Sequence, residues 1–122
     1  MHRIRLVACV LALAAWGNAA AQDLVKVADG KARVLLENDK VRVVELTSAP
    51  GERTAMHSHG DHLVYFLTAA EADETGADGT RQAKKFAPGD VLWLGPITHE
   101  TVNGGKDTVR TLIVELKDDP GA

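Results

Sequence analysis

Short strand-like runs separated by turn residues fill the sequence after residue 21, and they restrict the chain to all-β folds. The runs are rich in Val, Leu, Ile and Thr, and they span residues 32–37, 41–47, 63–68, 81–86, 91–94 and 109–117. Turn-forming sequences such as Asn38-Asp39, Pro50-Gly51 and Pro88-Gly89-Asp90 separate them. Because helix signals are weak throughout, this pattern predicts a β-sandwich or β-barrel.

Two segments depart from the strand pattern. Residues 71–80 are acidic, contain glycine and are poor in large apolar side chains, so we expect a solvated hairpin loop there. Residues 118–122 are expected to form a frayed tail. Along residues 41–47 both faces carry apolar side chains, so alternation alone does not identify the inner face.

The first 21 residues have the organisation of a secretory signal peptide. Two arginines precede an apolar run at 6–16 that is short for a bilayer span, and three alanines ending at Ala21 fit a small-x-small cleavage site. Cleavage there would export residues 22–122 to the periplasm or out of the cell. The alternatives are a retained membrane anchor and a lipoprotein box ending in Cys9, which we disfavour because no apolar segment precedes it.

Removing this segment changes what chemistry the chain can carry. Cys9 is the only cysteine, so the exported domain has no disulfide and no thiol ligand or nucleophile. Cleavage also removes two arginines, so the remaining chain has 12 basic and 17 acidic residues and a net charge of −5. A mildly acidic domain without a basic stripe is a poor nucleic-acid binder, and we expect no stable membrane insertion after cleavage. The remaining length fits one domain.

Four histidines remain after residue 21, and all four lie in two short stretches: His57, His59 and His62 in one, and His99 in the other. Side chains two residues apart on a strand share a face, about 7 Å apart, so His57 and His59 can converge on one ion. A turn at Gly60-Asp61 would let His62 approach the same ion, and a closed sheet would bring His99 alongside. Imidazole suits Zn, Fe, Mn, Ni or Cu. The alternative is that each histidine is structural.

Other side chains are weaker candidates for a functional role. Three aromatic residues are candidates to line a ligand cavity: Tyr65, Phe66 and Trp93. We expect them to fill the core instead, because aromatic side chains in small barrels mostly pack in the interior. Asn103 is expected to shape the turn that contains two glycines after it. The sequence shows no phosphate-binding glycine loop and no Ser/His/Asp arrangement, so it predicts no catalytic residue.

The two histidine stretches resemble the two sequence motifs of the cupin superfamily. Motif one begins with a glycine, five residues and His-x-His; here Gly51 is followed by five residues and His57-Ser58-His59, and the motif covers 51–69. Motif two is a glycine, five residues, Pro-x-Gly, two residues, a histidine and, after three more residues, an asparagine. Here Pro88-Gly89-Asp90 is followed by residues 91–94, then by Gly95-Pro96, and then by His99 and Asn103, over 88–103, with the loop at 95–98 one residue short of the pattern. The resemblance implies that residues 22–122 form a single cupin-type jelly-roll barrel.

The chain departs from the cupin pattern at the motif-one glutamate. His62 stands at that position, and the preceding loop is one residue shorter than usual. Carried over by position, the resemblance implies that His57, His59 and His99 bind a divalent metal, with His62 as a conditional fourth ligand. Asp61 is the only nearby acid that could replace the glutamate, and we expect it to cap the turn instead.

The resemblance leaves two functions open. The missing glutamate favours a small-molecule-binding or metal-binding module, because no carboxylate base would stand at the metal. The alternative is a metal-dependent enzyme of the oxygenase type acting on a small molecule, since some cupin dioxygenases use three histidines and leave open positions for substrate and oxygen. Cupins also often dimerise through strand edges, so we expect a homodimer.

Overall fold

The computed structural model describes residues 22–118. The predicted signal peptide and most of the predicted tail therefore lie outside the described residues. Within them the chain forms one single-turn helix and nine strands: α1 (Leu24–Val27), β1 (Ala32–Glu37), β2 (Val41–Ser48), β3 (Arg53–His59), β4 (His62–Phe66), β5 (Ala70–Gly76), β6 (Arg81–Phe86), β7 (Val91–Leu94), β8 (Ile97–Asn103) and β9 (Val109–Leu116).

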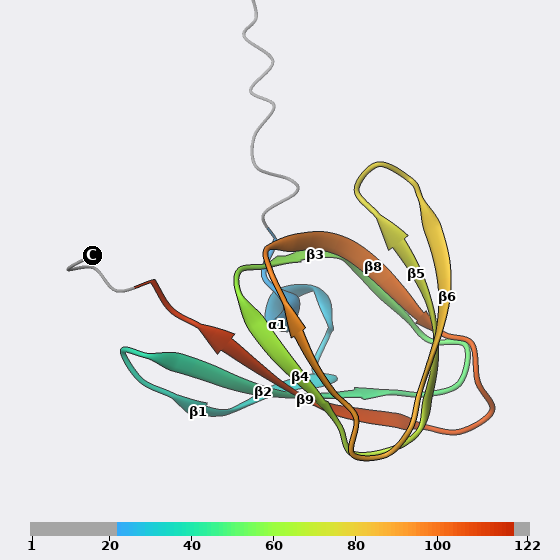
Figure 1. Cartoon of the computed structure of the whole chain (residues 1–122), viewed down its shortest axis with the longest axis horizontal. Helices are drawn as coiled ribbons and strands as arrows, with labels where there is room; N and C mark the ends of the chain where they lie inside the picture. The colour runs from blue at the N-terminus through green and yellow to red at the C-terminus, as the bar shows by residue number, and fades with distance from the viewer. Residues whose placement is uncertain (1–21, 119–122) are drawn as a thin grey trace, which may run out of the picture.

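The strands form two antiparallel sheets that face each other across the interior (Figure 1). One sheet has five strands in the order β1-β2-β9-β4-β7, and the other has four in the order β3-β8-β5-β6. Neighbours in the sheets are often distant in sequence, as in a jelly roll. The predicted all-β fold is confirmed. No helix among the described residues has the length and apolar character needed to cross a membrane.

The two sheets present different inner faces because the side chains alternate along each strand. In the five-stranded sheet one inner row, aligned by the strand register, is wholly apolar: Val44, Ile113, Val64 and Leu92. In the four-stranded sheet an inner row is polar: Thr54, Thr101 and Glu74. The interior therefore has an apolar wall and a polar wall, and the histidine motifs lie mainly on the polar one.

A small apolar core closes one part of the interior. Leu24 in α1 and Val44 in β2 are fully buried, and Ala28, Ala32 and Ile113 pack with them. The segment before α1 is tied to β3, because the backbone N–H of Ser58 donates a hydrogen bond of 2.9 Å to the Gln22 carbonyl. In this way α1 lies against β3, the strand that carries two of the histidines (Figure 1).

The structure corrects the expectation of a solvated loop at residues 71–80. Most of that segment is strand β5, which pairs with both β6 and β8, and only residues 77–80 form the turn. Its inward side chains are Ala70, Ala72 and Glu74, and they belong to the polar wall. The segment looked loop-like because a strand that forms part of the polar wall needs no large apolar residues.

Candidate metal centre and cavity

Three of the histidines converge inside the barrel. His57 on β3 and His99 on β8 are direct partners in the strand register, and His59 lies two residues along β3 on the same face. All three are buried, and each offers a ring nitrogen within 4.8 Å of the others. Two strands that are adjacent in space but about forty residues apart in sequence thus bring the two motifs together.

His62 lies beside this cluster, on the opposite sheet. It begins β4, is almost completely buried, and its ring stacks on His59 with a centroid distance of 4.5 Å and an interplanar angle of 26°. Its nitrogens are not part of the three-histidine group that could hold an ion. His62 would therefore lie next to a metal bound by the other three histidines.

Every one of the four histidines has its Nδ1 atom close to an oxygen. The Nδ1 atoms of His57 and His62 lie 2.7 Å from the carbonyl oxygens of Ala55 and Gly60. Those of His59 and His99 lie 3.0 Å and 3.1 Å from carboxylate oxygens of Glu115 and Glu74. The contact at His99 has the distance of a hydrogen bond but not its direction, so that buried nitrogen lacks a well-aligned partner. Oxygen acceptors at Nδ1 favour the proton there and leave Nε2 with its lone pair.

Burial favours the neutral form of His57, His62 and His99 by lowering the pKa of each ring. It lowers the pKa of His57 to about 4, against a weaker opposing effect of the hydrogen bond to Ala55. Burial also lowers the pKa of His62 and His99. Because a metal binds the neutral ring, these shifts reduce competition from protons.

A chain of charges leads from His59 to the surface. Glu115 on β9 contacts His59 through one oxygen, and its other oxygen accepts a hydrogen bond of 2.6 Å from Nε of Arg42. Arg42 in turn forms an ion pair with Asp23, next to α1. Burial alone would raise the pKa of Glu115, but the hydrogen bonds with His59 and Arg42 outweigh it and hold the pKa at about 2. Glu115 therefore stays ionised and fixes the ring of His59.

The donor set fits a divalent transition metal. Metal–imidazole bonds of about 2.0–2.1 Å place two ligand nitrogens no more than about 4.2 Å apart. The nitrogens here lie within 4.8 Å of one another, so small side-chain rotations would close them around an ion. Three neutral imidazoles held from behind by oxygen acceptors are typical of Zn, Fe, Mn, Ni or Cu sites.

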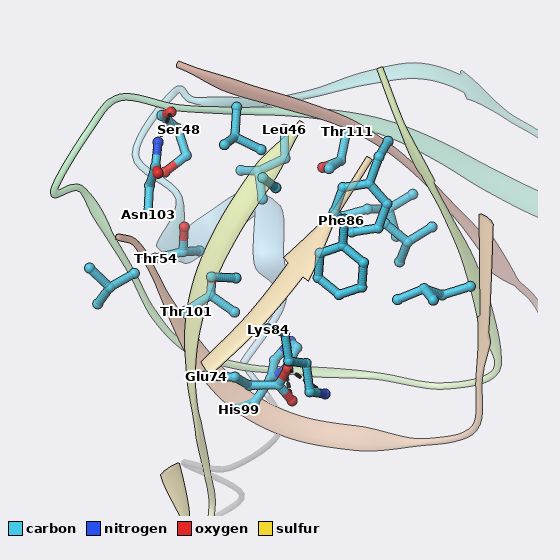
Figure 2. A pocket seen from close by; sticks show the side chains of 18 of the residues that line it. Leu46, Ser48, Thr54, Glu74, Lys84, Phe86, His99, Thr101, Asn103 and Thr111 are labelled. Atoms are coloured by element: carbon cyan, nitrogen blue, oxygen red, sulfur yellow. Dashed lines mark hydrogen bonds and ion pairs between the residues drawn. The ribbon is translucent and has the colours of Figure 1, made fainter. Parts of the chain in front are cut away.

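A cavity of about 130 Å³ adjoins the histidines. Figure 2 shows His99, Glu74 and Lys84 at one end of the view, and Leu46, Ser48 and Thr111 at the other. Much of the wall between is apolar, and it includes Phe66 and Phe86, whose rings stack with centroids 4.1 Å apart. A bound metal would thus face a space that is large enough for part of a small molecule.

The structure also shows where the other residues named in the sequence prediction lie. Phe66 is buried and lines the cavity, but Tyr65 and Trp93 are 37% and 60% exposed, so the expectation that both fill the core is wrong. They occupy outward positions on β4 and β7, where strand alternation directs them to solvent. Asp61 is exposed and is not among the cavity residues. Asn103 shapes its turn as expected, since it donates to the carbonyls of Ser48 and Asp107.

The acids that approach the histidines are not the one expected from the sequence. Asp61 was the only candidate there, whereas Glu115 and Glu74 make the contacts. Both stand at inward positions of their strands, and Glu115 follows the inward residues Thr111 and Ile113 in strict alternation. An acid in register with buried residues was the signal that could have identified it.

The fold matches solved structures of cupins. A cupin domain from Bordetella pertussis Tohama I has a TM-score of 0.67 and 21% identity, over 71% of this chain and 92% of that chain. A cupin superfamily protein from Desulfitobacterium hafniense DCB-2 has a TM-score of 0.55 and 26% identity, over 71% and 76%. This chain has the cupin fold. Its fold also resembles that of a polyketide cyclase from Streptomyces resistomycificus, with a TM-score of 0.57 and 23% identity, over 73% of this chain and 66% of that chain.

Comparisons of sequence alone add nothing to this identification. No protein-family model matches the chain, and no curated protein matches it. The assignment of the cupin fold therefore rests on the jelly-roll topology and on the two histidine motifs that this topology brings together.

Proposed function

We propose that this cupin is an exported module that binds a divalent transition metal and, beside it, a small molecule. His57, His59 and His99 would hold the metal through Nε2. The observation that carries the proposal is the convergence of three buried histidine nitrogens within 4.8 Å at the wall of a cavity. When bound, the metal would supply a Lewis acid with coordination positions that face the cavity.

His62 is proposed as a weaker fourth donor. Its stacking on His59 and its place outside the three-histidine group indicate that it would have to turn to reach the ion. A metal held by three histidines keeps positions open for a ligand, whereas a fourth histidine would use one of them. The role of His62 therefore decides how open the site is.

An oxygenase-type enzyme is the second candidate. It is favoured by the coordination positions that would face the cavity and by the apolar wall, which would exclude water from a reacting molecule. The similarity to a polyketide cyclase fits an enzyme on this fold but concerns the fold alone. We prefer the binding module, because Glu74 and Glu115, the acids that approach the imidazoles, are already engaged with histidines and with Lys84 or Arg42.

Elemental analysis tests the proposal. The protein, expressed from the full chain without a histidine tag, is expected to hold close to one equivalent of Fe, Mn, Ni, Cu or Zn. His57→Ala and His99→Ala should lose it, whereas Ser58→Ala, on the same strand but facing away, should retain it. His62→Ala should retain the metal with lower affinity. Absence of metal in the wild type, even after reconstitution with each ion, would overturn the proposal.

Two measurements follow, and only the second, oxygen consumption, separates the two candidates. The first uses a Co²⁺-substituted sample. Azide should change its visible spectrum, because at least one coordination position is open. Oxygen consumption with small phenols, thiols and diketones should stay at the background rate for a binding module. Turnover that is lost in His57→Ala would instead favour the enzyme.

A further inference from the structure

Lys84 is the cation of the cavity. Among the described residues that line it, Lys84 is the only lysine or arginine. It lies on β6 in the polar wall, and its side chain is 36% exposed, so it stands where the cavity meets solvent. The neighbouring Lys85 points outward and is 82% exposed. Alternation along one strand thus places one lysine inside and leaves the next outside.

The ammonium of Lys84 is held close to the histidine end. Its Nζ lies 3.0 Å from Oε2 of Glu74, and Oε1 of the same carboxylate lies 3.1 Å from Nδ1 of His99. Figure 2 shows these three side chains together. One Glu74 contact uses one of the three donors of an ammonium group, so the others remain for a ligand. Glu71, the other acid in the lining, is half exposed and faces Lys85.

One carboxylate lies between the two cationic centres. The two oxygens of Glu74 lie 3.0 Å from Nζ of Lys84 and 3.1 Å from Nδ1 of His99, so the ammonium and the histidine centre stand on either side of this carboxylate. A ligand that contacts both centres must therefore span the Glu74 carboxylate, and the apolar residues Val64, Leu92 and Ile113 line the same cavity.

We propose that the cavity takes a small organic acid with an apolar body, whose carboxylate binds Lys84 while a second oxygen points to the histidine centre. The proposal rests on the proposed function for the second oxygen only, since the contact with Lys84 needs no metal. An acid fits better than a neutral molecule because each polar end of the ligand would meet a positive centre. The flat apolar body would pack on the wall of the five-stranded sheet.

The probe is 4-hydroxybenzoate, and its neutral isostere 4-hydroxybenzamide is the control ligand. The para arrangement places the phenol oxygen and the carboxylate at opposite ends of a ring, as the two centres require. Calorimetric titration should show tighter binding of the acid than of the amide. Lys84→Met should reduce the ratio of the two affinities, acid over amide, by about tenfold, as expected for loss of a charged hydrogen bond. Lys84→Arg should keep the preference, and so should Lys85→Met, the matched surface control.

The titrations are run on metal-loaded and on chelator-treated protein. If the protein binds no metal, the preference for the acid that depends on Lys84 should still be seen in the chelator-treated protein. Failure of the metal proposal can therefore be distinguished from failure of this one. An unchanged preference in Lys84→Met would assign the selectivity to another group and overturn the proposal. Equal binding of acid and amide, or no binding of either at millimolar concentration, would also overturn it.

Discussion

At the scale of single residues, the chemistry of the centre depends on what holds each imidazole from behind. His57 and His62 rely on backbone carbonyls, which no substitution removes. His59 relies on a side chain, Glu115, which Arg42 and Asp23 hold in turn. His59 and, through a less well-aligned contact with Glu74, His99 are therefore the rings whose orientation can be altered without touching a metal ligand.

Glu115→Gln should weaken metal binding by about 10- to 100-fold, the usual effect of losing an acceptor behind a ligating histidine. The amide can still contact His59, but it loses the charge that strengthens the ring as a donor. Competition with a chromogenic chelator measures the affinity. Glu45→Gln, on the outer face of the same sheet, is the control. Equal affinity in Glu115→Gln and the wild type would show that this carboxylate does not support the site.

The metal-free protein should lose stability as the pH falls from about 6.5 to about 4. The pKa of His57 is about 4 in the folded protein, below its ordinary value of 6.5, so the unfolded chain takes up the proton first and gains stability. His62 and His99 act in the same direction. The loss from His57 alone is about 3 kcal/mol. Thermal unfolding of chelator-treated protein between pH 7.5 and 4.5 measures it, and a constant Tm over that range would contradict it.

At the scale of elements, sequence patterns identified six of the nine strands that the described residues form. Residues 32–37, 81–86 and 91–94 match β1, β6 and β7, and the other three runs match β2, β4 and β9 to within one or two residues. The pattern missed β3, β5 and β8, whose inward residues are threonines, histidines and small or charged side chains that form the polar wall. It also could not show α1, because a four-residue helix has no visible periodicity.

The same limit applies to the candidate site. The spacing of His57, His59 and His99 was sufficient to predict their convergence, since two motifs of a known family mark them. The partners Glu74, Glu115 and Arg42 come from strands with no motif, and only the register of the sheets shows that they face inward. Contacts across sheets cannot be read from local spacing.

The helix α1 makes a testable contribution to stability. Leu24 is fully buried against Val44 and Ile113, so Leu24→Ala should lower the free energy of unfolding by about 2–5 kcal/mol. Urea denaturation of metal-free protein measures the loss. Val25→Ala, at the edge of the same cluster, is the control and should cost less. A loss below about 1 kcal/mol for Leu24→Ala would show that the segment before β1 is not part of the core.

At the scale of the whole molecule, the outer faces of the two sheets differ. Among the described residues, the large hydrophobic side chains that are exposed all lie on or beside the five-stranded sheet: Val34, Leu35, Leu36, Tyr65, Leu67, Val91, Trp93 and Leu116. The strand register aligns an outward apolar row across all five strands: Leu36, Val43, Val114, Leu63 and Trp93. A continuous apolar band of this kind is typical of an interaction surface.

We expect a second copy of the chain to cover this band, which would place the predicted homodimer on a sheet face instead of on strand edges. A band that crosses the sheet can pair with itself about a twofold axis. Beside it, Glu45 is neutralised by Arg33 and Arg110, so like charges would not oppose the contact. Light scattering at micromolar concentration should give a dimer for the wild type and a monomer for Trp93→Glu. Arg81→Glu, on the four-stranded sheet, should remain dimeric, and a monomeric wild type would contradict the expectation.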